Sequence, residues 1–276
     1  MRNPKVPAQR GPQYKVMDVT PDLAEKWLDQ NTHNRNLREK AVMAYARDME
    51  AGNWAENGEA IKFGKDGTLL DGQHRLQAIA LSGATIKMLV VTGLESRTQE
   101  TMDDGRKRTL ADALHLRGET NSVVLGALLR RALMWDMGQY RNTGAYTPTN
   151  TECLTFLEEH PECRESASVA VALRKPVALP ASILGLTHWV FSRIDTEDAD
   201  FFFERLGTGA NLTQYHPILT LRKKSREVGE GPGRVPEDML LAFVIKAWNA
   251  YRDGDEMRLL RFKPGGAQPE KFPTPK

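Results

Sequence analysis

Hydrophobic positions along the chain change their spacing near residue 118. Up to that point, short runs such as Tyr14–Val19 and Ile86–Val91 are β-branched or alternate with polar residues, which is typical of strands. Beyond it, apolar residues recur every three or four positions over long segments, which predicts a series of helices. The pattern therefore predicts an α+β protein, with a small mixed α/β domain over residues 14–118 and an all-helical domain over residues 119–262.

Both ends of the chain lack such a pattern. Residues 1–13 are rich in proline, glycine and arginine, and we expect them to form a flexible arm. Residues 258–262 are apolar enough to predict a short strand. The segment 263–276 contains four prolines, so we expect a loose tail there.

A predicted hairpin is followed directly by a predicted helix in the first half of the chain. Two short apolar runs, Ala60–Phe63 and Thr68–Leu70, flank a Gly-Lys-Asp-Gly turn and predict paired strands. Apolar residues from Leu76 onward then follow a helical spacing that ends at Gly83. Gly72 is therefore expected where a strand leads into a helix.

The first turn of this helix carries residues that suit an anion. Backbone N–H groups at a helix N-terminus have no partner within the helix, and the helix dipole favours negative charge there. His74 and Arg75 fall in this turn, where a fixed cation would strengthen the attraction. The pattern thus predicts a phosphate site. The alternative is a capped surface helix whose His74 and Arg75 face water.

Composition limits the class of protein. The chain has 276 residues, a formal net charge of +2, 40% hydrophobic and 27% charged residues, as is ordinary for a globular protein. With so small a net charge, any nucleic-acid contact must depend on a local cluster of cations. Cys153 and Cys163 lack metal-ligand spacing, so we expect two reduced thiols. No apolar run is long enough to span a membrane and no signal-peptide pattern occurs, so we expect a cytoplasmic protein without a membrane partner.

The stretches Asn57–Ile61 and Asp71–Arg75, separated by the predicted hairpin, resemble the ParB/sulfiredoxin superfamily. They read N-G-E-A-I and D-G-Q-H-R. ParB-type partition proteins carry a G-E box before a G-E-R-R box, sulfiredoxins have G-C-H-R at the second box, and D-G-Q-H-R itself occurs in DndB-like proteins of DNA-modification systems. The resemblance covers roughly residues 15–116. Chains with this layout are similar to those of phages and plasmids.

The resemblance implies a ParB/sulfiredoxin-like domain that binds a nucleoside triphosphate, ATP or CTP, together with Mg²⁺. Asp103 or Asp104 would hold the magnesium, in the segment where partition proteins have a third box. Glu59, Asp71 and His74 would be the candidates for catalytic roles. The residues that would bind the nucleotide are Gly58, Gly72, Gln73, His74, Arg75, Arg106 and Arg108.

Three functions are compatible with these residues. The first is a ParB-like nucleoside-triphosphate-binding protein that is associated with DNA and hydrolyses the nucleotide slowly. The second is a phosphotransferase, or kinase, that acts on a hydroxyl of a small molecule or a modified DNA base, with Glu59 or Asp71 near that hydroxyl. The third is a non-catalytic binding module. Sulfiredoxin chemistry is excluded, because Gln73 stands where that reaction requires a cysteine thiolate.

A cluster of basic residues on a predicted helix from residue 217 to about 227 is the best candidate for DNA contact. Contact with the phosphate backbone needs only such a cluster. A solvated helix end explains the cluster equally well, because cations are favoured near a helix C-terminus. The sequence does not specify an oligomeric state. The four residues are Arg222, Lys223, Lys224 and Arg226.

Overall fold

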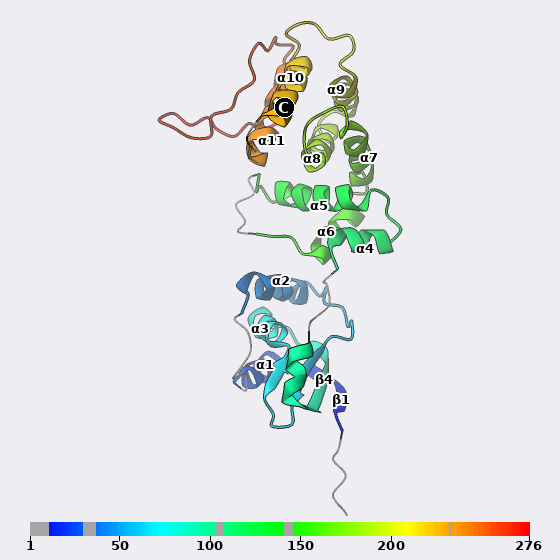
Figure 1. The fold of residues 1–276 in the computed structure, drawn as a ribbon, viewed down its shortest axis with the longest axis vertical. Coiled ribbons are helices and arrows are strands. Elements are labelled where there is room, and N and C mark those ends of the chain that lie inside the picture. The colour runs from blue at the N-terminus through cyan, green and yellow to red at the C-terminus, as the bar shows by residue number, and fades with distance from the viewer. Residues whose placement is uncertain (1–10, 30–36, 103–107, 141–145, 232, 234) are drawn as a thin grey trace, which may run out of the picture. The chain divides into compact units, whose positions relative to one another are not determined.

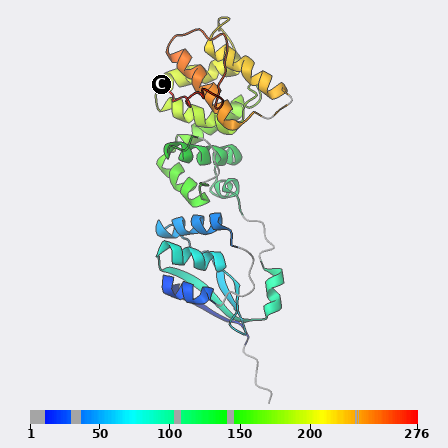
Figure 2. The ribbon, with the colours of Figure 1, turned by 90° about the vertical axis from the view of Figure 1, so that its left-hand side faces the viewer.

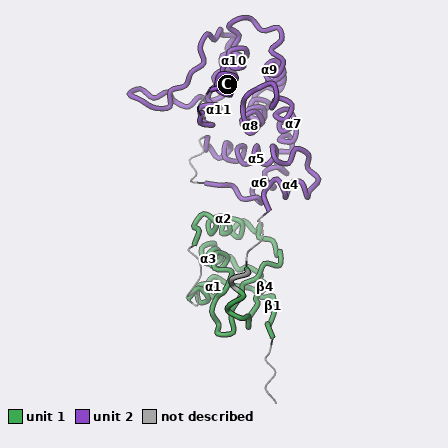
Figure 3. The backbone as a smooth tube through the Cα atoms, viewed as in Figure 1, with its two compact units in different colours: residues 1–107 green, residues 108–276 purple. Residues whose placement is uncertain are grey.

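The computed structural model of the protein describes residues 11–29, 37–102, 108–140, 146–231, 233 and 235–276 (Figure 1). The chain divides into two compact units, residues 1–107 and residues 108–276 (Figure 3). This division falls before the expected boundary after residue 118, because helix α4, Leu110–Leu116, packs against helix α5, Ser122–Asp136. The α+β class predicted from the sequence is confirmed.

The N-terminal unit contains a four-stranded mixed sheet with the order β1-β4-β2-β3. Strand β1, Gln13–Val19, is antiparallel to β4, Ile86–Leu94, and β4 is parallel to β2, Ala60–Gly64. Strands β2 and β3, Leu69–Asp71, form the predicted antiparallel hairpin. Its register pairs Lys62 with Asp71, so a cation and a carboxylate meet at the end of β3.

Three helices and the sheet share one hydrophobic core in this unit (Figure 2). Strand residues such as Ile61 and Phe63 pack there with apolar residues of each helix. After β4 the chain forms a short 3-10 helix, η1, Ser96–Thr101. The three helices are α1, Pro21–Leu28; α2, Glu39–Glu50; and α3, Gln73–Ser82.

The described part of the second unit is helical, as the sequence predicted. Thr109 begins α4 in a capping box with Asp112, as expected, and Thr149 does the same with Glu152 at α6. The helices that follow α5 are α6, Asn150–Glu159; α7, Cys163–Leu173; α8, Ala181–Ser192; α9, Thr196–Thr208; α10, Pro217–Glu230; and α11, Glu237–Arg252.

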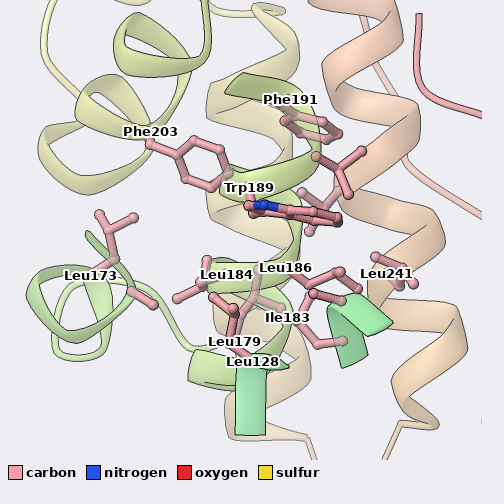
Figure 4. Close-up of a cluster of buried hydrophobic side chains, with 14 of the residues drawn as sticks. Leu128, Leu173, Leu179, Ile183, Leu184, Leu186, Trp189, Phe191, Phe203 and Leu241 are labelled. Carbon is pink, nitrogen blue, oxygen red and sulfur yellow. The ribbon is translucent and has the colours of Figure 1, made fainter. Parts of the chain in front are cut away.

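Helix α8 lies at the centre of the core of this unit. Its residues from Ile183 to Phe191 are all buried, as expected for a helix that is covered on every side. Figure 4 shows Trp189, Phe191 and Phe203 gathered in this cluster. Phe191 also stacks on Trp248 of α11, with ring centroids 4.2 Å apart. The second unit therefore has a hydrophobic core of its own.

The end of the chain differs from the prediction. Residues 258–262 form no strand in the structure. The tail, expected to be loose, is bound to helix α11: Trp248 Nε1 donates to the carbonyl of Lys276 over 2.9 Å, and Asn249 Nδ2 donates to that of Thr274 over 2.9 Å. Phe272 packs against the core. Prolines prevent regular hydrogen bonding along this segment, but they do not prevent it from packing.

The two cysteines are free thiols, as expected. Both are buried, and burial raises the pKa of Cys153 and of Cys163 to about 12, so neither is a reactive thiolate at neutral pH. Across the described residues, no helix combines the length and the apolar character that a membrane crossing requires.

One polar pair is enclosed in the helical core. His188 Nδ1 and Ser166 Oγ lie 2.9 Å apart, and both side chains are buried. Burial lowers the pKa of His188 because the charged imidazolium would lose its hydration, while the carboxylates of Asp200 and Glu165 oppose this shift without reversing it. His188 is therefore neutral in the folded unit at neutral pH.

We expect the helical unit to lose stability as the pH falls from about 7 to about 5. The unfolded chain gains a proton at this histidine near a pKa of about 6.5, whereas the folded unit gains it only at lower pH. Burial also lowers the pKa of His216, which adds to the loss. Urea denaturation at both pH values should show that the free energy of unfolding falls less in His188→Gln than in the unsubstituted protein. Equal losses in the two proteins would contradict this assignment.

Candidate phosphate-binding site

The candidate site is built around the junction between β3 and α3. Gly72 has a φ of +105° there, in the left-handed region that residues with a side chain rarely adopt. A Cβ atom at this position would lie 2.5 Å from Ile61 Cδ1 and 3.2 Å from Ile61 Cα. Glycine is therefore required by both the turn and the close approach of β2. The junction fixes the first turn of α3, and with it the positive end of the helix dipole, beside this strand.

Asp71, the last residue of β3, is held between two cations. Its Oδ2 accepts from Lys62 Nζ over 2.9 Å and from Arg75 Nη2 over 3.2 Å. Burial acts to raise the pKa of Asp71, but Arg75, Lys62 and the backbone N–H of Gly72 outweigh it, and the pKa is lowered. Asp71 is therefore a firmly ionised carboxylate with low affinity for a proton.

The guanidinium of Arg75 is held firmly at Nη2 and only weakly at Nη1. Nη2 donates to the carbonyl of Ala60 over 2.8 Å as well as to Asp71, and Nε is buried without a hydrogen-bond partner among the described residues. Within the described part of the chain, the contact of Nη1 is a long one, 3.5 Å to Glu59 Oε2. The planar fork is thus anchored to β2 and β3, and Nη1 is the nitrogen that it presents to a further anion.

His74 connects the same turn to the start of helix α2. Its Nε2 lies 3.0 Å from the backbone nitrogen of Arg38 and accepts a hydrogen bond from it. This contact requires an unprotonated Nε2, which we assign from the hydrogen-bond geometry. With Nε2 engaged in this way, His74 orients the beginning of α2 and has no spare Nε2 for a phosphate oxygen.

Gly58 and Glu59, which precede β2, line a cavity. It has a volume of about 340 Å³. Glu59 lines this cavity and also forms an ion pair with Arg75. Apolar and charged groups both contribute to the wall, which is lined by Val16, Trp54, Ala55, Glu56, Asn57, Gly58, Glu59, Lys87, Met88 and Leu89.

The structure brings together part of the predicted nucleotide site. Glu59 and Asp71 each contact Arg75, and Gln73 is buried at the first position of α3. Gly58 precedes Glu59 in the cavity wall with a φ of +81°. These residues come from the ends of β2, β3 and α3, which are adjacent because of the hairpin register.

The remaining predicted residues lie outside the described part of the N-terminal unit. Arg108 is exposed and belongs to the second unit. Asp103, Asp104 and Arg106 lie outside the described residues. Within the ranges that the structure describes, no three His, Cys, Asp or Glu side chains are grouped to hold a metal ion, so magnesium stays a prediction.

Sequence reasoning missed Lys62 and Arg38. Lys62 interrupts the apolar run of β2, and this was a usable signal, because a lysine within a buried strand indicates a partner nearby. The role of Arg38 had no such signal, since its backbone N–H and not its side chain makes the contact with His74.

The four basic residues of α10 differ in their contacts. Arg222 Nη1 donates to the carbonyls of Leu206 and Gly207 at the end of α9. Lys224 pairs with Glu227 over 3.0 Å. Of the four, Lys223 and Arg226 are the exposed ones without an ion pair among the described residues. Contact of this cluster with DNA stays a prediction.

Comparison of the chain with protein-family models, with curated proteins and with solved structures found no match. The likeness to the ParB/sulfiredoxin superfamily therefore stays a prediction, based on the N-G-E-A-I and D-G-Q-H-R stretches.

Proposed function

We propose that the N-terminal unit binds the phosphate chain of a nucleoside triphosphate, ATP or CTP with Mg²⁺, at the β3–α3 junction. The observation that carries the proposal is the anchoring of Arg75. Two contacts hold Nη2 against Ala60 and Asp71, while Nη1 has only a 3.5 Å contact with Glu59. An arginine fixed in this way presents its charge without losing much side-chain entropy when an anion binds.

Two further features support a phosphate ligand. The left-handed Gly72 fixes the N-terminus of α3 beside Arg75, so a helix dipole and a guanidinium would act on the same anion. The resemblance of the N-G-E-A-I and D-G-Q-H-R stretches to the ParB/sulfiredoxin superfamily also implies a triphosphate at this box. The charges of Lys62 and Arg75 are balanced by Glu59 and Asp71, so this group of side chains carries no uncompensated buried charge.

Binding is better supported than phosphoryl transfer. A kinase needs a carboxylate that can accept or orient the proton of the acceptor hydroxyl. Asp71 is unsuited to this task, because Lys62 and Arg75 occupy its oxygen and its pKa is lowered. Glu59 is the remaining candidate for this carboxylate, but it forms an ion pair with Arg75. DNA association stays a separate prediction that depends on Lys223 and Arg226.

Thermal unfolding with a panel of nucleotides tests the proposal. We expect ATP or CTP with Mg²⁺ to raise the midpoint of the N-terminal unit, since a ligand at about 100 times its Kd adds about 2.7 kcal/mol of stability. Arg117→Ala, which removes an exposed arginine of the second unit, is the matched control and should keep the full shift. A panel of ATP, CTP, GTP and UTP that leaves the midpoint unchanged at millimolar concentration would count against nucleotide binding.

A further inference from the structure

Glu59 is the described residue that contacts Nη1 of Arg75, the nitrogen left for a further anion. Its Oε2 is 3.5 Å from Nη1, whereas Nη2 is held by the carbonyl of Ala60 and Nε is buried. A carboxylate and a phosphate present similar oxygen pairs to an arginine fork. The position beside Nη1 that a phosphate oxygen would take is therefore filled by a carboxylate of the protein itself.

We propose that Glu59 is an intramolecular competitor for the phosphate site, which must leave Arg75 before an anion binds there. The inference rests on the proposed function and gives this residue a role opposite to that of a catalytic base. A catalytic carboxylate assists turnover and its removal lowers activity. A competing carboxylate weakens binding, and its removal makes the ligand bind more tightly.

The contacts of Glu59 and Asp71 differ in the way that this role requires. The Glu59 side chain is 56% exposed and has one long contact to Arg75, whereas the Asp71 side chain is 15% exposed and is held by two cations. An exposed ion pair of this kind contributes little and is readily broken. Asp71 thus stays in place to anchor Arg75 while Glu59 is free to exchange.

The cavity beside Glu59 offers a place for the displaced side chain. Glu59 already lines this space of about 340 Å³, and Lys87 lies in the same wall without an ion pair among the described residues. A carboxylate that turns away from Arg75 therefore finds both room and a cation. Release of Glu59 gives up only one long, exposed ion pair, which keeps the displacement inexpensive.

Isothermal titration of Glu59→Gln with ATP, CTP and inorganic tripolyphosphate tests the inference. We expect each anion that binds the unsubstituted protein to bind the variant about three- to fivefold more tightly, since an exposed ion pair no longer opposes it. Glu56→Gln is the matched control. It removes the same charge from the same cavity wall, where no contact with Arg75 exists, and should change Kd by less than about 1.5-fold.

The outcomes separate this inference from the proposed function. Binding to the unsubstituted protein with equal or weaker binding to Glu59→Gln would overturn the competitor role and leave the phosphate site standing. Equal gains in Glu59→Gln and Glu56→Gln would also overturn it, since the effect would then be that of charge at a distance. If neither nucleotide nor tripolyphosphate binds any of the three proteins, the proposed function itself fails.

Discussion

Replacing Gly72 with alanine is expected to destabilise the N-terminal unit by about 3 kcal/mol. Backbone strain at a positive φ contributes about 1–2 kcal/mol. The new methyl would also lie 2.5 Å from Ile61 Cδ1 and 3.2 Å from Ile61 Cα. The first atom can move with its side chain, but the second belongs to the backbone of the central strand β2, so the junction must shift by a few tenths of an ångström.

Gly83, at the other end of the same helix, is the matched control. It has a φ of +68°, and a Cβ there would meet nothing within 4 Å. Gly83→Ala should therefore cost only the backbone term, about 1 kcal/mol. Amide hydrogen exchange of strands β2 and β4 reports the stability of this unit apart from the helical one. Equal losses in the two variants would show that the contact between Gly72 and β2 contributes nothing.

Arg75→Ala is expected to abolish most nucleotide binding. A charge-assisted hydrogen bond to a phosphate contributes about 2–3 kcal/mol, so we expect Kd to rise roughly 30- to 150-fold. The same change removes the donor to Ala60 and one of the two cations of Asp71, which should lower stability by about 2 kcal/mol. Titration calorimetry, at a temperature where the variant is folded, measures the first effect separately from the second.

Two further variants separate recognition from folding. Lys62→Met removes the other cation of Asp71 and should lower stability to a similar extent, but Kd should change far less, because Lys62 is used to hold Asp71. Arg75→Lys keeps the charge and loses the fork, so it should recover only part of the affinity. If Lys62→Met weakens nucleotide binding as much as Arg75→Ala, the specific role of the Arg75 fork is refuted.

The order of the elements around the site could be read from the sequence. Apolar runs and the Gly-Lys-Asp-Gly turn predicted the hairpin, and the helical spacing after Gly72 placed the start of α3 within one residue. These features depend on neighbours in the chain. The partners of Arg75 could not be predicted in the same way, because the contact with Ala60 depends on how β2 and β3 are paired.

The basic residues of α10 illustrate the same limit. In the sequence Arg222, Lys223 and Lys224 are equivalent neighbours, and the packing of α9 against α10 distinguishes Arg222 from the other two. Arg222 satisfies carbonyls at the end of α9, which a helix C-terminus leaves without partners. The docked tail is a second case. Proline content predicted its lack of regular structure correctly, and its contacts with Trp248 and Asn249 involve backbone carbonyls that no sequence pattern reveals.

Nuclear magnetic resonance of the amide groups during a titration with ATP or CTP and Mg²⁺ tests the phosphate site most directly. If the phosphates bind at the junction, the N–H resonances from Gly72 to Arg75 and that of Glu59 should move together and saturate with one Kd. Those of Gly83 and Ala84, at the far end of α3, should stay in place. Saturable binding whose shifts leave residues 72–75 unchanged would contradict the assignment of this turn as the ligand site.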